Sequence, residues 1–175
     1  QCSVQHLVEE AIKHGILHTL LISEDSKEQN KKLLRSTSLK AVYLLPYELM
    51  QKVNLLDNAT DIVGLIKIED FELSENVYNA DCIILENIQD PGNLGTILRG
   101  CAASGVKNIV LSTNCVDVYN PKVLRGSQGT QFGLNIYANV DLVGFVGRYN
   151  KNIIITTPHA DKSFYDINLI EPVAF

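Results

Sequence analysis

The sequence predicts an α/β protein of two domains, and three observations support this. Of its 175 residues, 46% are hydrophobic and 20% are charged, a composition typical of globular proteins. Short apolar runs alternate with amphipathic stretches in two successive segments, as strands and helices do in α/β folds. An acidic stretch without a sustained period, residues 73–80, separates them, so we expect a linker there between domains at 1–72 and 81–175.

The first segment predicts three helices and three strands. Gly15 is a suitable stop for the first helix, and Pro46 stands where the third can begin. Apolar residues at helical spacing predict helices over 6–14, 26–36 and 47–55. Short apolar runs predict strands over 16–22, 41–45 and 62–68.

The second segment restarts the alternation and predicts a parallel sheet with helices on both faces. Consecutive apolar residues predict strands over 82–85, 108–112, 135–138 and 152–156, with another opening at Val173. Helical patterns predict helices over 93–104, 121–127 and 142–149, the first with Asn93 as N-cap and Gly105 at its end. Ligands of such sheets bind beyond the carboxyl ends of the strands.

Charge is distributed unevenly along the chain. The net charge of −5 argues mildly against a nucleic-acid partner when the chain is taken whole. Residues 91–135 are the one net-positive stretch, at +3, because they carry Asp117 alone against four basic residues: Arg99, Lys107, Lys122 and Arg125. The region that also holds the unusual motifs is therefore the one suited to an anionic partner.

Several classes of protein and site are not expected. The four cysteines form no CxxC pair and predict reduced thiols of a cytoplasmic protein. No apolar run approaches the roughly 18 residues of a membrane span, so no membrane partner is expected. His14 and His18 have i, i+4 spacing, but Gly15 between them interrupts the helix, so no metal site is expected.

The stretch from Leu85 to Arg99 carries the strongest chemical signal. It predicts a strand, a Pro91-Gly92 turn and a helix whose N-terminal N–H groups suit an anion. Gly95 leaves the backbone approachable, and Arg99 follows one turn later on the same face, where its guanidinium suits a phosphate or ribose. The alternative is a glycine-containing turn followed by a surface arginine. The pattern is neither GxGxxG nor GK[ST], which argues against a dinucleotide site and a P-loop.

Two stretches of the second segment resemble one enzyme family. Residues 86–99, followed by Ala102-Ala103-Ser104-Gly105, resemble the first signature motif of the SpoU (TrmH) family of RNA ribose 2′-O-methyltransferases. Residues 119–130 are similar to the family's conserved segment between its first two signatures. Residues 1–72 resemble, more loosely, the family's N-terminal substrate-binding domain, whose fold is like that of small ribosomal RNA-binding proteins.

The resemblance implies a fold, a reaction and partners. The fold is a small ribosomal-protein-like α/β RNA-binding domain followed by a parallel-sheet SPOUT catalytic domain of the trefoil-knot type. The reaction is methyl transfer from S-adenosylmethionine to a ribose 2′-hydroxyl of RNA, either ribosomal or transfer RNA, with the two-domain layout favouring 23S ribosomal RNA. The implied assembly is a homodimer.

The resemblance also implies roles for individual residues. The Asn and Arg of the first motif, which serve the family's catalytic centre, fall on Asn93 and Arg99. The RNA-facing side of the second stretch falls on Lys122, Arg125 and Ser127. The strand end that can touch the methyl donor falls on three consecutive residues: Thr156, Thr157 and Pro158.

The sequence departs from the family's pattern at its end. The family's glycine-rich GxExxG loop should follow the strand begun at Val173, and its last signature should come after that loop, but the sequence stops at Phe175. Because those segments form most of the donor pocket and the knot, we expect this polypeptide to be inactive alone. The alternative function is a non-catalytic RNA-binding module that uses residues 1–72, or an inactive fragment of such an enzyme.

Overall fold

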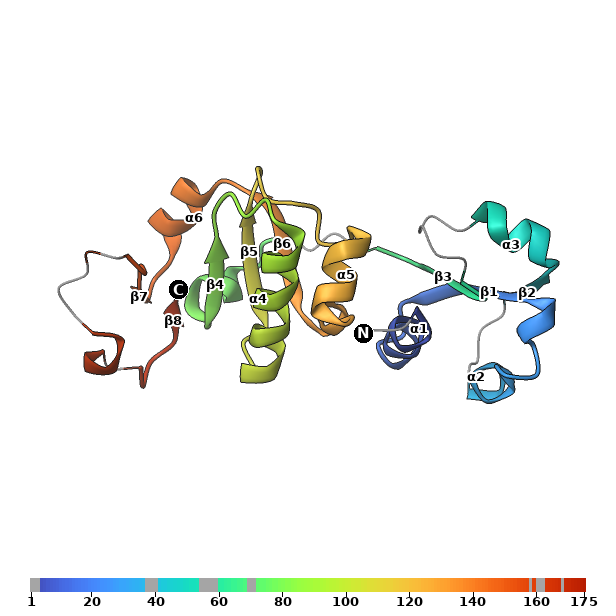
Figure 1. The fold of residues 1–175 in the computed structure, drawn as a ribbon. Coiled ribbons are helices and arrows are strands. Elements are labelled where there is room, and N and C mark those ends of the chain that lie inside the picture. Colours follow the sequence, from blue (N-terminus) through green and yellow to red (C-terminus); the bar gives the residue numbers. More distant parts are fainter. Residues whose placement is uncertain are drawn as a thin grey trace. The chain divides into compact units, whose positions relative to one another are not determined.

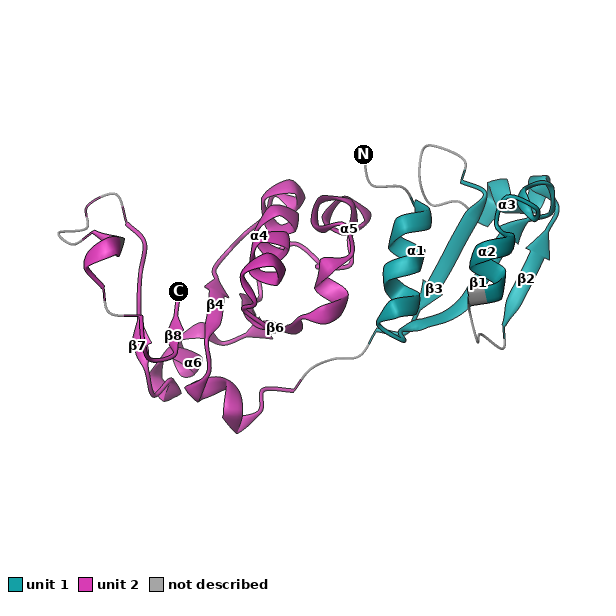
Figure 2. Cartoon of the chain, turned by 90° about the horizontal axis from the view of Figure 1, so that it is seen from below, with its two compact units in different colours: residues 1–69 teal, residues 70–175 magenta. Residues whose placement is uncertain are grey.

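The chain folds into two compact units, residues 1–69 and 70–175 (Figure 2). The structure is a computed structural model that describes residues 4–36, 41–53, 60–68, 72–157, 159, 163–167 and 169–175. Within these residues, no helix is long and apolar enough to cross a membrane, and no group of three or more His, Cys, Asp or Glu could hold a metal ion.

The first unit is built on a three-stranded sheet with the strand order β2-β1-β3 (Figure 1). Strand β1 pairs with β2 in parallel and with β3 in antiparallel orientation. Its elements in chain order are α1 (Val4–Lys13), β1 (Leu17–Ser23), the 3₁₀ helix η1 (Glu24–Ser26), α2 (Lys31–Ser36), β2 (Val42–Leu45), α3 (Tyr47–Val53) and β3 (Ile62–Ile66). Gly15 follows α1 with φ 70°, as expected for a helix stop. The helix expected over 26–36 is shorter, because η1 and a turn take its first part.

The second unit is a five-stranded, all-parallel sheet with the order β6-β5-β4-β8-β7, which confirms the predicted parallel architecture. Its elements in chain order are η2 (Glu75–Asn79), β4 (Cys82–Leu85), α4 (Pro91–Ser104), β5 (Asn108–Ser112), α5 (Pro121–Ser127), η3 (Thr130–Gly133), β6 (Asn135–Val140), α6 (Leu142–Arg148), β7 (Asn152–Ile153), η4 (Phe164–Asp166) and β8 (Val173–Ala174). The strand expected over 152–156 is shorter than predicted. The strand expected from Val173 forms, and it lies between β4 and β7.

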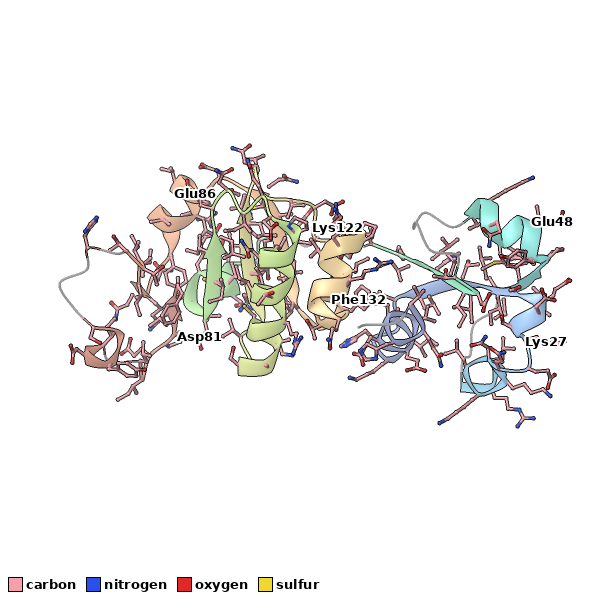
Figure 3. The ribbon with its side chains drawn as sticks, in the orientation of Figure 1. Lys27, Glu48, Asp81, Glu86, Lys122 and Phe132 are labelled. Carbon is pink, nitrogen blue, oxygen red and sulfur yellow. The ribbon has the colours of Figure 1, made fainter. Side chains whose placement is uncertain are left out.

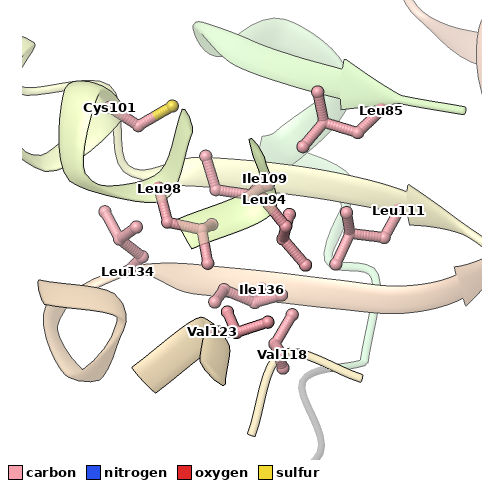
Figure 4. Packing of buried hydrophobic residues seen from close by; sticks show 10 residues of the cluster. All are labelled: Leu85, Leu94, Leu98, Cys101, Ile109, Leu111, Val118, Val123, Leu134 and Ile136. Atoms are coloured by element: carbon pink, nitrogen blue, oxygen red, sulfur yellow. The ribbon is translucent and has the colours of Figure 1, made fainter. Parts of the chain in front are cut away.

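Two apolar clusters cover the two faces of this sheet. On one face, buried residues of α4 and α5 pack against alternate residues of β4, β5 and β6 (Figure 4). On the other face, Val77 and Tyr78 of η2 and Phe145 of α6 pack against Cys82, Val110 and Tyr137 of the strands. The period of two along β4, with Cys82 facing one cluster and Leu85 the other, is the reason that four consecutive apolar residues are all accommodated.

The stretch 73–80, which the sequence predicts to be a linker, belongs to the second unit. Its 3₁₀ helix buries Val77 and Tyr78, at 1% and 3% exposure, and the Tyr78 ring stacks on Phe145 with 5.0 Å between ring centroids. The Arg148 guanidinium lies over the Tyr78 ring, 4.3 Å from its centroid, and pairs with Glu75 at 2.6 Å. A single short helical turn has too few residues to show a period, so the sequence pattern did not reveal this packing.

Helices α4 and α5 approach each other at two glycines. A Cβ atom on Gly95 would lie 2.9 Å from the Gly126 Cα and 3.0 Å from the Ser127 backbone nitrogen. Backbone atoms cannot move aside as a flexible side chain can, so only glycine fits at this crossing. The sequence predicts an open, ligand-accessible backbone at Gly95, but Gly95 is buried under α5, and this prediction is wrong.

We expect Gly95→Ala to destabilise the second unit, because the new methyl group would push α4 away from α5. Overpacking of this kind costs about 1–3 kcal/mol of unfolding free energy. Gly100→Ala is the matched control, since Gly100 lies in the same helix and a Cβ there meets nothing within 4 Å. The control should gain about 0.5–1 kcal/mol from helix propensity. Urea unfolding measures the free energy of unfolding of both variants. Equal changes for Gly95→Ala and Gly100→Ala would contradict the packing argument.

Candidate functional site

The candidate site lies at the carboxyl edge of the parallel sheet in the second unit. Glu86, which follows β4, and Lys122, in the first turn of α5, both lie at this end, whereas Asp81, which precedes β4, lies at the opposite end (Figure 3). The helices α4 and α5 begin at the carboxyl edge, since each follows the end of a parallel strand. This is the edge where α/β sheets bind their ligands.

Helix α4 begins two residues earlier than the sequence predicts. Asp90 is the N-cap in place of Asn93, and its Oδ1 accepts a hydrogen bond from the Asn93 backbone N–H at 2.7 Å. Pro91 occupies the first helical position, where its fixed φ and missing N–H are favourable. The Pro91-Gly92 pair, expected to form a separate turn, is therefore the start of the helix itself. Gly105 ends the helix with φ 82°, as predicted.

This cap changes the character of the helix N-terminus. The Asp90 carboxylate already occupies the Asn93 N–H, one of the N-terminal N–H groups expected to suit an anion. A negative side chain also neutralises the partial positive charge of the helix end. This N–H of α4 is therefore not available to an anion, and the cations of α4 and α5 are further groups for an anionic ligand.

Asn93 and Arg99 are both exposed on α4, at different levels of the helix. Six residues separate them, which corresponds to about 9 Å along the axis and two-thirds of a turn around it. Side chains on a helix generally tilt toward its N-terminus, and the N-terminus of α4 lies at the carboxyl edge of the sheet. Within the described part of the chain, no hydrogen bond or ion pair engages either side chain, so both are available to a ligand.

Helix α5, which packs against α4, carries two further exposed cations, Lys122 and Arg125. Asn120 caps it by accepting a hydrogen bond from the Lys122 backbone N–H at 2.9 Å, and Pro121 stands at the first helical position, as the sequence predicts. Lys122 and Arg125 are exposed. Because Gly126 touches Gly95, the helix that carries these cations is held directly against the helix that carries Arg99.

Ser127, which the resemblance places on the RNA-facing side, is buried and is not part of the exposed surface formed by Lys122 and Arg125. Its side chain is fully buried, and its hydroxyl donates to the Gln131 Oε1 and accepts from the Gly129 N–H at 3.3 Å. The Gln131 amide in turn donates to the Val118 carbonyl at 3.2 Å. Ser127 therefore stabilises the tight turn after α5. Gln131, which the sequence did not single out, is its buried partner.

An apolar cavity of about 450 Å³ opens at the same sheet edge, on the side of β7 and β8. Its wall is formed by Ile153, Ile154 and Ile155 with Phe175 and residues of α6, and Glu86 and Thr156 are its polar lining groups. Of the predicted donor-binding residues, Thr156 lines this cavity, Thr157 is exposed outside it, and Pro158 lies outside the described residues. The sequence did not single out Glu86 as a lining group, because its place depends on β4 and β7 lying on either side of β8 in the sheet.

The groups with shifted pKa values lie away from this edge. Burial raises the pKa of the Cys82 thiol to about 11, and burial also raises the pKa of Tyr149. Cys82 is the first residue of β4, and the Tyr149 hydroxyl donates to the Ala80 carbonyl at 2.8 Å, which places both at the amino edge. Both groups stay protonated at neutral pH, so neither is a candidate base.

The sequence is similar to a known protein family and to individual methyltransferases. Residues 80–175 match the model of the SpoU rRNA Methylase family. A tRNA/rRNA methyltransferase of Synechocystis, described as uncharacterized, is 34% identical over 133 residues, which are 74% of this chain and 48% of the relative. The 23S rRNA (guanosine(2553)-2′-O)-methyltransferase RlmP of Bacillus subtilis is 28% identical over 133 residues, which are 75% of this chain and 51% of RlmP.

Solved structures agree with the fold. A crystal structure of an RNA 2′-O ribose methyltransferase superposes with a TM-score of 0.71 at 26% identity, covering 99% of this chain and 68% of that one. The SpoU methyltransferase AviRb of Streptomyces viridochromogenes, in complex with AdoMet, superposes with a TM-score of 0.75 at 20% identity, covering 96% of this chain and 68% of AviRb.

The all-parallel sheet, together with the likeness to the solved RNA 2′-O ribose methyltransferase, identifies the chain as a SPOUT-type α/β protein. The chain belongs to the SpoU rRNA methylase family. It spans about half the length of the two bacterial relatives described above.

Substitution of the buried Ser127 should affect stability more than substitution of the exposed Lys122 or Arg125. We expect Ser127→Ala to lower the free energy of unfolding by about 1–3 kcal/mol, because the buried Gln131 oxygen loses its donor. Lys122→Ala and Arg125→Ala should change it by no more than about 0.5 kcal/mol, since both side chains are exposed. Chemical denaturation of the three variants tests this, and a stable Ser127→Ala variant would argue against the buried network.

Proposed function

We propose that the natural protein transfers a methyl group from S-adenosylmethionine to a ribose 2′-hydroxyl of 23S ribosomal RNA. The observation that carries this proposal is that an apolar cavity and the start of α4, the helix that carries the free side chains of Asn93 and Arg99, lie at the same sheet edge of a SpoU family chain. The choice of 23S ribosomal RNA is supported by the similarity to RlmP, whose name states this substrate and this reaction.

The cavity residues fit the methyl donor. Its volume is within the range of roughly 300–1,000 Å³ found for small-molecule sites. The isoleucine wall suits a flat adenine ring, and the Glu86 carboxylate and Thr156 hydroxyl can bond ribose hydroxyls. These residues would hold the donor, whose sulfonium supplies an activated methyl group and its own leaving group.

The residues of α4 and α5 then act on the RNA side. Arg99 is not assigned the role of the base, because guanidinium groups are poor proton acceptors. It instead binds the phosphate beside the target ribose and stabilises the alkoxide that develops as the 2′-hydroxyl loses its proton. The Asn93 amide orients the ribose, since it offers both donors and an acceptor. Lys122 and Arg125 bind neighbouring phosphates and fix the register of the RNA.

The remaining parts of the proposal concern the first unit, the assembly and the compartment. We propose that residues 1–69 bind the RNA substrate, that the catalytic domain is of the knotted type and that the protein is a homodimer, all supported by the resemblance to the family. We also propose a cytoplasmic location, supported by the free thiols of Cys82, Cys101 and Cys115, which a reducing compartment preserves. Analytical ultracentrifugation of the natural protein tests the dimer.

The direct test is methylation of ribosomal RNA by the natural, full-length protein with a labelled donor. Alkaline hydrolysis then locates the product, since 2′-O-methylation protects the neighbouring phosphodiester from cleavage. Incorporation that gives such an alkali-resistant linkage supports the proposal. Tight RNA binding without methyl transfer would support the non-catalytic RNA-binding alternative, and base methylation would overturn the assignment to ribose.

Substitution of Arg99 tests its role in this reaction. We expect Arg99→Ala to lower the single-turnover rate about 10²–10³-fold, because one preorganised contact to developing charge is lost. Arg99→Lys should retain only a small part of the activity, since lysine lacks the fork that binds two oxygens at once. Donor affinity should change little in either variant.

Lys107→Ala is the matched control, because it removes one exposed positive charge at the amino edge of the same sheet, just before β5. It should leave the single-turnover rate close to that of the unsubstituted protein. Circular dichroism confirms that the helix is retained, since alanine and lysine both favour helices. A near-normal rate for Arg99→Ala would remove Arg99 from the mechanism.

A further inference from the structure

We propose that Ser112 and Cys115 are positioning residues for the candidate active site. They form a clamp, by which we mean these two side chains and the hydrogen bonds they make to residues 85–88. The clamp holds the loop 86–90, which joins the donor cavity to the start of α4. This inference rests on the proposed methyltransferase function, and it assigns to the two residues a role in alignment and not in chemistry.

The Ser112 side chain holds one end of this loop. Its Oγ, at the carboxyl end of β5, accepts a hydrogen bond from the Asn87 backbone N–H at 2.9 Å. Asn87 has φ 54°, in the left-handed region that residues other than glycine seldom adopt. The Gln89 side chain also donates to the Asn87 Oδ1 at 3.1 Å. Asparagine adopts this region more readily than other non-glycine residues, and the serine hydroxyl adds a hydrogen bond that holds the Asn87 backbone N–H in this conformation.

The Cys115 sulfur holds the next part of the loop. Its Sγ donates to the Leu85 carbonyl at 3.4 Å and accepts from the Ile88 N–H at 3.4 Å. It also lies 3.6 Å from the Ser112 Oγ, which joins the two side chains into one network. The adjacent Val116 N–H donates to the Ile88 carbonyl at 2.8 Å, so the turn after β5 bonds the end of β4 at Leu85 and both backbone groups of Ile88.

The loop connects the two halves of the candidate site. Glu86, at its start, lines the donor cavity, and Asp90, at its end, caps α4 and bonds the Asn93 N–H. The conformation of these five residues therefore sets the distance between a donor in the cavity and Asn93 on the helix. Methyl transfer requires in-line alignment, and a misplacement of about 1 Å can lower a rate about 10²-fold.

A contribution to alignment can be separated from a contribution to stability. Asn87 is exposed, and Ser112 and Cys115 are only partly buried. Water can replace the lost hydrogen bonds at such positions, so their removal should cost little unfolding free energy. The loop would nevertheless become free to adopt other conformations, and this should appear in the rate of the methylation step.

The experiment uses the natural, full-length protein with Ser112→Ala, Cys115→Ala and the double substitution. We expect the double variant to lower kcat for ribosomal RNA methylation about 10- to 100-fold, with KM for RNA changed less than about 3-fold. Cys115→Ser and Ser112→Thr keep a group that can donate and accept a hydrogen bond, so both should recover most of the rate.

Ser104→Ala and Cys101→Ala are the matched controls. The Ser104 hydroxyl bonds the Cys101 carbonyl at the other end of α4, and Cys101 is buried in the apolar cluster against which Cys115 packs.

Hydrogen exchange of the backbone amides of residues 86–90 supplies a second measurement that does not depend on activity. We expect faster exchange in the double variant and unchanged exchange in the two controls. Faster exchange together with a normal kcat would overturn the positioning role. A kcat loss matched by the controls, or one accompanied by a larger fall in melting temperature than theirs, would show a structural role only. Faster exchange in a protein whose unsubstituted form methylates no RNA would refute the proposed function and leave the clamp as a loop-ordering device.

Discussion

The backbones of α4 and α5 touch at Gly95 and Gly126. The position of the exposed cations on α5 relative to Arg99 on α4 depends on this contact. With no side chain at either position, α5 lies directly against α4 and brings Lys122 and Arg125 to the helix that carries Arg99. Any larger residue at Gly95 would meet backbone atoms of Gly126 at 2.9 Å, which would force the helices apart. The glycine thus serves the site indirectly, through helix packing, and not as a backbone surface for a ligand.

The parallel sheet supplies the second half of the site. Strand β8 lies between β4 and β7, and the Asp81 Oδ1 accepts a hydrogen bond from the Val173 N–H at 2.8 Å, which fixes the start of β8 beside β4. The Phe175 N–H donates to the Cys82 carbonyl at 3.0 Å and continues this pairing. Because β8 separates β4 from β7, the carboxyl edge gains a cavity between Glu86 on one side and Ile153–Thr156 on the other.

Chemical function is divided between these two regions. The cavity is mainly apolar with a carboxylate and a hydroxyl, which suits a nucleoside-like methyl donor. The surface of α4 and α5 offers exposed cations and an amide, which suits a phosphodiester backbone. Asp90 caps α4 with a negative charge, so the positive character of the surface comes from Arg99, Lys122 and Arg125 and not from the helix dipole.

The sequence by itself determined the α/β class, the parallel second unit, most element positions and the motif that led to the family. These features depend on local period, on Pro and Gly punctuation and on residue order, which are legible along the chain. Only the tertiary structure decided that Asp90 caps α4, that η2 packs into the second unit, that Ser127 is buried against Gln131, and that α5 covers Gly95. The packing of η2 and the cover over Gly95 depend on which residues distant in sequence meet in space. The Asp90 cap and the Ser127–Gln131 bond are local, but they depend on where α4 begins and on how the chain turns after α5. A serine or a glycine has the same local preference whether another helix covers it or a ligand does, so its role cannot be read from its neighbours in the chain.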